Sequence, residues 1–124
     1  MRVLIVEDEW LIATDMAETL RQAGHEVSGI AMDGDEALAI AKNTAPELVL
    51  MDLRLANGSS GEDAAQRLRN EAKLRCIFVS ANLDDATVTR LQQLEPLGFV
   101  AKPILATRLK QAMGMAEIAL SATA

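Results

Sequence analysis

The chain has 124 residues, of which half are hydrophobic and only three are aromatic, and its net charge is −6. This length suits a single domain with an aliphatic core, and the negative charge argues against a nucleic-acid partner, which requires clustered Lys and Arg. The charge is also too small, and the chain too apolar, for a disordered acidic tail.

Cysteine content and apolar run lengths indicate the compartment. The single cysteine, Cys76, rules out an internal disulfide and is typical of a reducing environment. The first apolar run starts at residue 3 and ends at Glu7, which is too short for a signal peptide. No run approaches the ~20 apolar residues that cross a membrane. We therefore expect a cytoplasmic protein that has neither a leader nor a membrane partner.

Short apolar segments that alternate with helical patterns predict five strands. In chain order these segments are RVLIV (2–6), VSGIA (27–31), ELVLM (47–51), CIFVS (76–80) and GFVA (98–101). Four of them are almost continuously apolar, as strands covered by helices on both faces are. Ser28 and Gly29 dilute the second segment, which predicts an edge strand.

Two of the predicted helices have an apolar stripe at helical spacing. The first stripe comprises Ala13, Met16, Ala17 and Leu20, and the second comprises Leu105, Leu109, Ala112, Met113, Ala116 and Leu120. Helix breakers fall between the predicted elements, at Gly24, Asn57-Gly58, Pro46, Pro96 and Pro103. The alternation predicts an α/β fold with a parallel sheet and right-handed crossovers. No linker, repeat or low-complexity tract divides the chain, so residues 1–124 are expected to form one domain without an output domain.

Polar residues stand where the predicted strands end. Glu7 and Asp8 follow the first strand, Asp52 ends the third, Ser80 ends the fourth and Lys102 follows the fifth. Because parallel strands end at one edge of the sheet, where ligands bind in such folds, these residues should converge in one pocket. A lone aspartate in such a position is usually a cap or turn former, but polar residues at four strand ends together favour chemistry.

Three carboxylates in one pocket repel one another, at a cost of about 3 kcal/mol per pair for charges ~5 Å apart at an effective dielectric of ~20. Lys102 offsets one charge, and a divalent ion would offset two. Oxygen ligands with room for water suit Mg²⁺. A carboxylate beside Mg²⁺, a hydroxyl and an ammonium group is equipped to accept a phosphoryl group, because this transfer depends mainly on positioning and charge neutralisation.

Four motifs occur in order along nearly the whole chain: VLIVEDE (3–9), LVLMDLRL (48–55), IFVSAN (77–82) and GFVAKP (98–103). With these motifs the sequence resembles the receiver domain of two-component response regulators, in particular stand-alone receivers of the chemotaxis type. The resemblance implies a doubly wound five-stranded parallel sheet, a (βα)5 fold with the flavodoxin-like strand order 2-1-3-4-5. It also implies a phosphoprotein of phosphorelay signal transduction, which receives its phosphoryl group from a sensor histidine kinase or a phosphotransfer protein.

The resemblance implies a phosphoacceptor and a metal site. Asp52 is the phosphoacceptor, so this aspartate ends an apolar strand because its carboxylate is the nucleophile. Glu7, Asp8 and Asp52 hold Mg²⁺ together with the backbone carbonyl of Arg54. On this view the protein is a phosphoacceptor and not an enzyme, because the only phosphorylation and slow dephosphorylation that it catalyses are its own.

The resemblance also implies residues that bind the phosphoryl group, respond to it and set its lifetime. Ser80 and Lys102 contact it, and the peptide bond from Lys102 to the following proline is expected to be cis. Ser80 and Phe99 form a conformational switch, while Arg54 and Asn82 tune the phosphoryl lifetime. The expected output surface is the fourth helix, fifth strand and fifth helix, over roughly residues 84–120, which binds a downstream protein or a second copy of the chain.

The sequence departs from the family pattern in several places. Ser80 replaces the more common Thr, which keeps the required hydroxyl. The loop after Asp52 lacks the usual proline and is one residue longer before Gly61. Ile104 stands where Phe is usual, and Arg54 is a bulky cation at a variable position.

Two other functions share parts of the pattern. A flavin-binding protein needs a Ser/Thr/Gly-rich phosphate loop after the first strand, where VEDEW would repel phosphate. A Mg²⁺-dependent phosphohydrolase with an aspartyl nucleophile typically carries a second acid two residues after the nucleophile, where this sequence has Arg54. Among receiver roles, a phosphorelay intermediate and a phosphate sink stay open.

Some conspicuous residues are predicted to be structural. His25 should be a polar residue at the start of the second strand, and Cys76 a small buried one. The methionines should fill the core, with Met113 and Met115 as candidates for a contact surface. Two positions are open for Trp10, the core and a half-exposed rim of the pocket.

Overall fold

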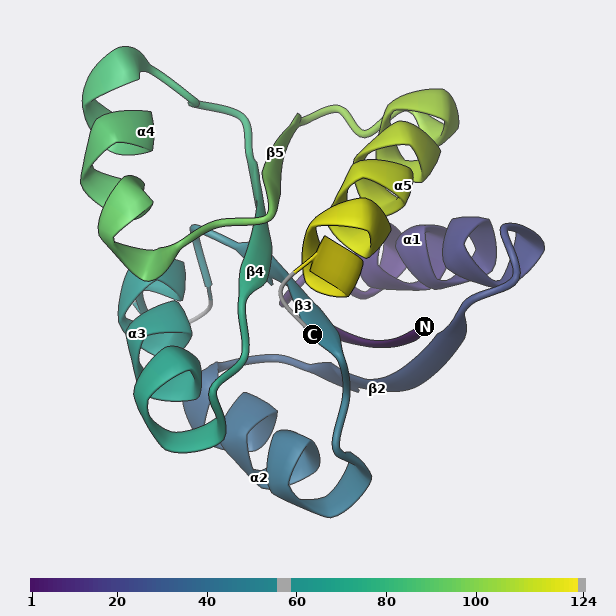
Figure 1. Cartoon of the computed structure of the whole chain (residues 1–124), viewed down its shortest axis with the longest axis horizontal. Coiled ribbons are helices and arrows are strands. Elements are labelled where there is room, and N and C mark those ends of the chain that lie inside the picture. Colours follow the sequence, from purple (N-terminus) through teal and green to yellow (C-terminus); the bar gives the residue numbers. More distant parts are fainter. Residues whose placement is uncertain (56–58, 123–124) are drawn as a thin grey trace.

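The computed structural model describes residues 1–55 and 59–122, in which strands and helices alternate (Figure 1). The strands are β1 (Arg2–Val6), β2 (Glu26–Ala31), β3 (Leu48–Asp52), β4 (Cys76–Ser80) and β5 (Gly98–Ala101). The helices are α1 (Trp10–Gln22), α2 (Gly34–Thr44), α3 (Gly61–Ala72), α4 (Asp85–Leu91), the short 3-10 helix η2 (Gln92–Leu94) and α5 (Ala106–Ala122). All five predicted strands are confirmed to within one residue at each end, while the predicted turn at Asn57-Gly58 lies outside the described residues.

The strands form one parallel sheet in the order β2-β1-β3-β4-β5. This order confirms the predicted fold class and the edge position of the strand diluted by Ser28 and Gly29. Every residue of β3 and β4 is buried, which explains their continuous apolar runs. The order also sets the carboxyl ends of β1, β3 and β4 side by side.

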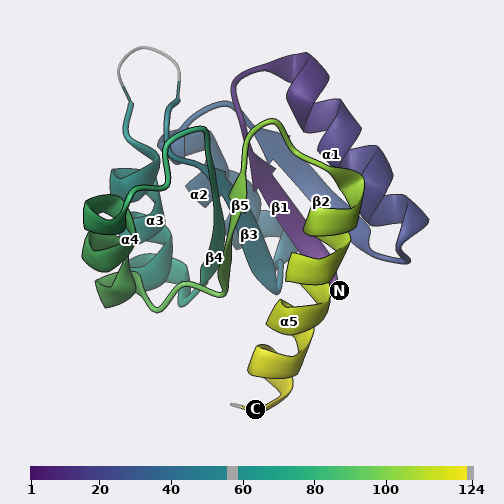
Figure 2. The same cartoon turned by 90° about the horizontal axis from the view of Figure 1, so that it is seen from above.

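Helices cover both faces of the sheet (Figure 2). Side chains of α2, α3 and α4 pack on one face, and side chains of α1 and α5 pack on the other. Within β3 the residues alternate, so that Val49 and Met51 point to the first face and Leu48 and Leu50 to the second. Each central strand therefore contributes to two cores.

The predicted helix stripes face the sheet, with one exception. Met16 in α1 and Leu109 and Met113 in α5 are buried, but Leu105 precedes α5 and is 56% exposed. Trp10 begins α1 and is 60% exposed, which places it at the rim of the molecule and not in the core.

The structure also shows the surroundings of Cys76 and of the two methionines suggested for a contact surface. Cys76 is buried in β4, and burial raises the pKa of its thiol to about 12, as for a small core residue. Of the two methionines suggested for a contact surface, Met115 is exposed and Met113 is not. Among the residues that the structure describes, no helix is long and apolar enough to cross a membrane.

Candidate functional site

The carboxyl edge of the sheet carries a polar pocket. Glu7 and Asp8 directly follow β1, Asp52 ends β3, Ser80 ends β4 and Lys102 directly follows β5. A hollow of about 250 Å³ opens beside the acceptor candidate. Its lining comprises Glu9, Asp52, Arg54, Ser80, Ala81, Asn82 and Lys102. The structure thus brings the residues singled out at the strand ends to one edge of the sheet.

Lys102 joins two buried carboxylates. Its Nζ lies 2.8 Å from Glu7 Oε1 and 3.2 Å from Asp52 Oδ2. The ammonium group therefore offsets part of the charge on both. The Lys102-Pro103 peptide bond is cis, as expected.

Burial perturbs the protonation of the pocket. Loss of solvent raises the pKa of Glu7 to about 7, and the neighbouring Asp52 adds to this rise. The Lys102 ammonium and the Glu9 N–H, which donates to Glu7 Oε2 over 3.2 Å, oppose the rise in this pKa. Burial lowers the pKa of Lys102, but its close contact with the Glu7 carboxylate and the charge of Asp52 outweigh burial, so this pKa lies above its ordinary value. Added positive charge would favour the ionised form of Glu7.

The acidic cluster fits a hard divalent cation. One carboxylate oxygen from each of Glu7, Asp8 and Asp52 lies within 4.8 Å of the others. Glu7 Oε1 is paired ionically with Lys102, yet no donor makes a well-directed hydrogen bond to this buried oxygen. Such an all-oxygen set suits Mg²⁺. The backbone N–H of Arg54 donates to Asp52 Oδ1 over 3.2 Å, and the role of the Arg54 carbonyl as a further ligand stays a prediction.

Ser80 and Asn82 form a compact turn after β4. The N–H of Asn82 donates to Ser80 Oγ over 3.0 Å, and the Ser80 hydroxyl donates to the Asn82 carbonyl over 3.4 Å. Ser80 is buried, whereas Asn82 is exposed at the mouth of the pocket. The Ser80 hydroxyl is therefore engaged within its own loop.

Gly61, for which the sequence predicted no role in the site, lies against the backbone of Asp52. Its N–H donates to the Leu53 carbonyl over 3.1 Å, and a Cβ at this position would lie 1.9 Å from the Asp52 carbonyl oxygen. Ser60 caps α3 by accepting a hydrogen bond from the N–H of Asp63. A glycine that follows a serine cap was the available signal. Gly61 allows α3 to begin in direct contact with the backbone of Asp52.

Phe99 lies in β5, the edge strand that runs between α4 and α5 (Figure 1). It is partly buried, and its ring stacks on Phe78 with the ring centroids 6.0 Å apart. It also lines a groove of about 600 Å³ between β5 and α5, together with Leu105, Arg108 and Met115. The ring therefore has a core contact on one side and an open groove on another.

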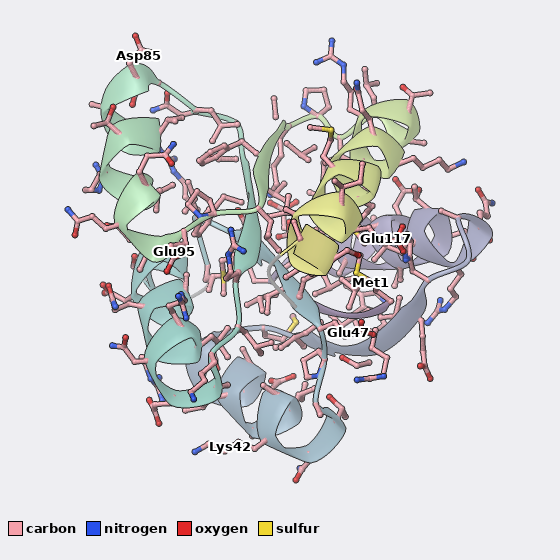
Figure 3. The ribbon with its side chains drawn as sticks, in the orientation of Figure 1. Met1, Lys42, Glu47, Asp85, Glu95 and Glu117 are labelled. Carbon is pink, nitrogen blue, oxygen red and sulfur yellow. The ribbon has the colours of Figure 1, made fainter. Side chains whose placement is uncertain are left out.

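His25 lies away from the pocket, at the end of the sheet where β1 begins. The Met1 ammonium is 3.1 Å from His25 Nδ1, and burial followed by this charge lowers the pKa of His25. Figure 3 shows Met1 in the neighbourhood of Glu47 and Glu117. These contacts agree with the prediction that His25 is a structural residue.

Comparison with known proteins agrees with this geometry. The sequence matches the family model described as the response regulator receiver domain over residues 3–114. It is 35% identical over 115 residues to the transcriptional regulatory protein PdtaR of Mycobacterium tuberculosis, covering 93% of this chain and 56% of that protein. It is 39% identical over 102 residues to the phyllosphere-induced regulator PhyR of Methylorubrum extorquens, covering 82% of this chain and 38% of that protein. The chain therefore spans roughly half the length of these relatives, or less.

Solved structures share the fold over almost the whole chain. The signal receiver domain of a modulated diguanylate cyclase from Desulfovibrio desulfuricans G20 has a TM-score of 0.87 and 32% identity, covering 99% of this chain and 98% of that one. The response regulator PhyR from Brucella abortus has a TM-score of 0.85 and 37% identity, covering 98% of this chain and 49% of that one. On the family match and these structures, the chain belongs to the response regulator receiver domain family.

Proposed function

We propose that the protein accepts a phosphoryl group on Asp52 from a sensor histidine kinase or a phosphotransfer protein and signals through a change of shape. The observation that carries this proposal is the setting of the Asp52 carboxylate, which ends β3 with Lys102 Nζ 3.2 Å away and two further carboxylates beside it. The proposed site comprises Asp52 as acceptor, Ser80 and Lys102 as phosphoryl contacts, and Glu7, Asp8, Asp52 and the Arg54 carbonyl as Mg²⁺ ligands.

The proposed transfer exchanges one bond. A carboxylate oxygen of Asp52 forms a bond to phosphorus while the bond from phosphorus to the donor's histidine nitrogen breaks, and the nitrogen keeps the electron pair. The Lys102 ammonium and the Ser80 hydroxyl donate to the phosphoryl oxygens. When bound, Mg²⁺ supplies further positive charge for these oxygens. The residues of the chain thus position the nucleophile and neutralise charge, which is most of what this reaction requires.

The lifetime of the phosphoryl group is proposed to depend on the mouth of the pocket. Arg54 and Asn82 are both exposed and both line the hollow beside Asp52. A hydrolytic water that enters through this hollow would pass near these two side chains, so their size and charge would tune slow dephosphorylation.

The change of shape is proposed to begin at Ser80. Its hydroxyl must leave the Asn82 carbonyl, 3.4 Å away, to donate to the phosphoryl group. This movement draws the loop between β4 and α4 toward Asp52 and leaves space beside β4 into which Phe99 can turn. The face formed by α4, β5 and α5 then changes, which biases a two-state element.

The proposed output is contact with a protein, either a downstream partner or a second copy of the chain. PhyR from Bartonella quintana, which is 33% identical to this chain, is described as an anti-anti-sigma factor. By this likeness, and because the net charge of −6 disfavours nucleic acid, we assign the face of α4, β5 and α5 to a protein partner in the cytoplasm.

Acetyl phosphate with Mg²⁺ tests the proposal against a phosphohydrolase. The intact mass should gain one phosphoryl group, which is lost slowly, and a generic phosphomonoester should not be turned over. Repeated turnover of the phosphomonoester would contradict the proposal and favour the hydrolase. Return of the group to a phosphotransfer protein would identify a relay role.

Phe99→Ala should separate phosphorylation from output. The ring lies in β5 and not among the residues that line the hollow beside Asp52, so labelling of Asp52 by acetyl phosphate should match the wild type. The Phe99→Ala variant lacks the ring that is proposed to turn toward β4. The partner contact through α4, β5 and α5 that depends on phosphorylation should therefore weaken. NMR chemical shifts of the wild type with beryllofluoride show whether activation reaches α4 and β5. Shifts confined to the pocket would refute the switch.

A further inference from the structure

Helix α4 has little buried surface. Only Leu91 of its seven residues is buried. Its start is stabilised within the same segment, where Asp84 accepts a hydrogen bond from the N–H of Thr87 over 2.8 Å. Figures 1 and 2 place α4 at the margin of the molecule next to α3, and Figure 3 labels Asp85 and Glu95 at the two ends of the α4–η2 segment. Within α4 itself, Leu91 is therefore the one fully buried side chain that opposes displacement of the helix.

An ion pair joins α4 to α3. The Nε atom of Arg90 donates to both carboxylate oxygens of Glu62, over 2.8 and 3.1 Å. The two side chains are 55% and 32% exposed. Among the described residues, this is the one ion pair between α4 and another helix, since the pair of Arg69 with Glu95 attaches the chain after η2.

The two partners belong to the two segments that meet at the acceptor. Glu62 follows Gly61, which is in contact with the backbone of Asp52 and donates to the Leu53 carbonyl. Arg90 lies on the helix that the Ser80 loop leads into. The pair therefore links α3, which begins against the backbone of Asp52, to α4, which follows the loop after Ser80.

A polar hollow of about 210 Å³ separates these segments. Its lining comprises Leu53, Arg54, Ser60, Glu62, Ser80, Asn82, Thr87 and Arg90. Three of these residues, Arg54, Ser80 and Asn82, also line the acceptor pocket. Movement of the Ser80 loop toward a phosphoryl group on Asp52 would change this hollow and with it the separation of Arg90 from Glu62.

We propose that the Glu62–Arg90 ion pair is a restraint that holds α4 in its resting position and opposes the phosphorylated conformation. This inference rests on the proposed function and names a regulatory contact for the same site. Because an exposed ion pair contributes weakly, its loss should shift the equilibrium by about two- to fivefold. The pair thus tunes activation without preventing it.

Beryllofluoride, which mimics a phosphoryl group on aspartate, tests the restraint. We expect Arg90→Gln and Glu62→Gln each to bind beryllofluoride with Mg²⁺ about two- to fivefold more tightly than the wild type, as followed by the NMR signals of α4. The double variant should bind no more tightly than either single variant, because one interaction is lost in all three. Exchanging the charges, Glu62→Arg with Arg90→Glu, should restore the wild-type affinity.

Arg67→Gln is the matched control. It removes the exposed pair of Arg67 with Asp35, 2.7 Å apart, which joins α3 to α2 and does not involve α4, so affinity should not change. Wild-type affinity in both single variants would overturn the restraint and leave the proposed function intact, even if their melting temperatures fell. Failure of the wild type to bind beryllofluoride would overturn both.

Discussion

Replacing Asp52 with Asn should abolish phosphorylation by acetyl phosphate while the protein stays folded. The amide keeps the shape of the side chain but is not a nucleophile. The variant also removes one of the three clustered carboxylates, so repulsion with Glu7 and Asp8 decreases as the pairing with Lys102 is lost. Intact mass spectrometry should show no phosphoryl adduct, and circular dichroism should show the wild-type helix content.

Asp15→Asn is a suitable control for this experiment. Asp15 lies exposed on α1 and is not a member of the acidic cluster, so its variant should be labelled like the wild type. An adduct of unchanged size and yield in the Asp52→Asn variant would exclude Asp52 as the acceptor.

Mg²⁺ should stabilise the folded protein, and Asp8→Asn should remove most of this effect. Burial and the neighbouring Asp52 raise the pKa of Glu7 to about 7, which indicates that negative charge is costly in this pocket. A cation that binds only the folded state, at about 100 times its dissociation constant, adds about 2.7 kcal/mol to the free energy of unfolding. Thermal unfolding with and without Mg²⁺ measures the difference.

The Asp8→Asn variant should be compared with Asp15→Asn, which keeps all three carboxylates of the cluster. The control should show the full rise in melting temperature on adding Mg²⁺. If the Asp8→Asn variant shows the same rise, then the cation binds elsewhere and the assignment of Glu7, Asp8 and Asp52 is wrong.

Local patterns were enough to predict the strands, their parallel arrangement and the convergence of the polar strand ends, whereas the strand order came from the family resemblance. The continuous apolar runs of β3 and β4 reflect their burial on both faces of the sheet, and Ser28 and Gly29 in β2 reflect its position at the sheet edge. Because all strands of a parallel sheet end at one side, the positions of Asp52 and Lys102 followed from the strand assignments alone.

Contacts between distant exposed residues could not be predicted in this way. Glu62 and Arg90 are 28 residues apart, and charged residues on solvent-facing helix surfaces give no periodic signal that identifies their partners. The exposure of Trp10 and Leu105 depends on where α1 and α5 begin. The contact of Gly61 with the backbone of Asp52 depends on the path of the intervening loop, which sequence spacing does not determine.

Borohydride trapping after labelling with acetyl phosphate reads the acceptor most directly. Borohydride reduces the acyl phosphate of a phosphorylated aspartate to homoserine, so peptide sequencing by mass spectrometry identifies the carboxylate that was modified. We predict homoserine in place of Asp52 and at no other acidic position. Homoserine in place of Asp8 or of any other aspartate, with Asp52 unmodified, would contradict the assignment of Asp52 as the phosphoacceptor.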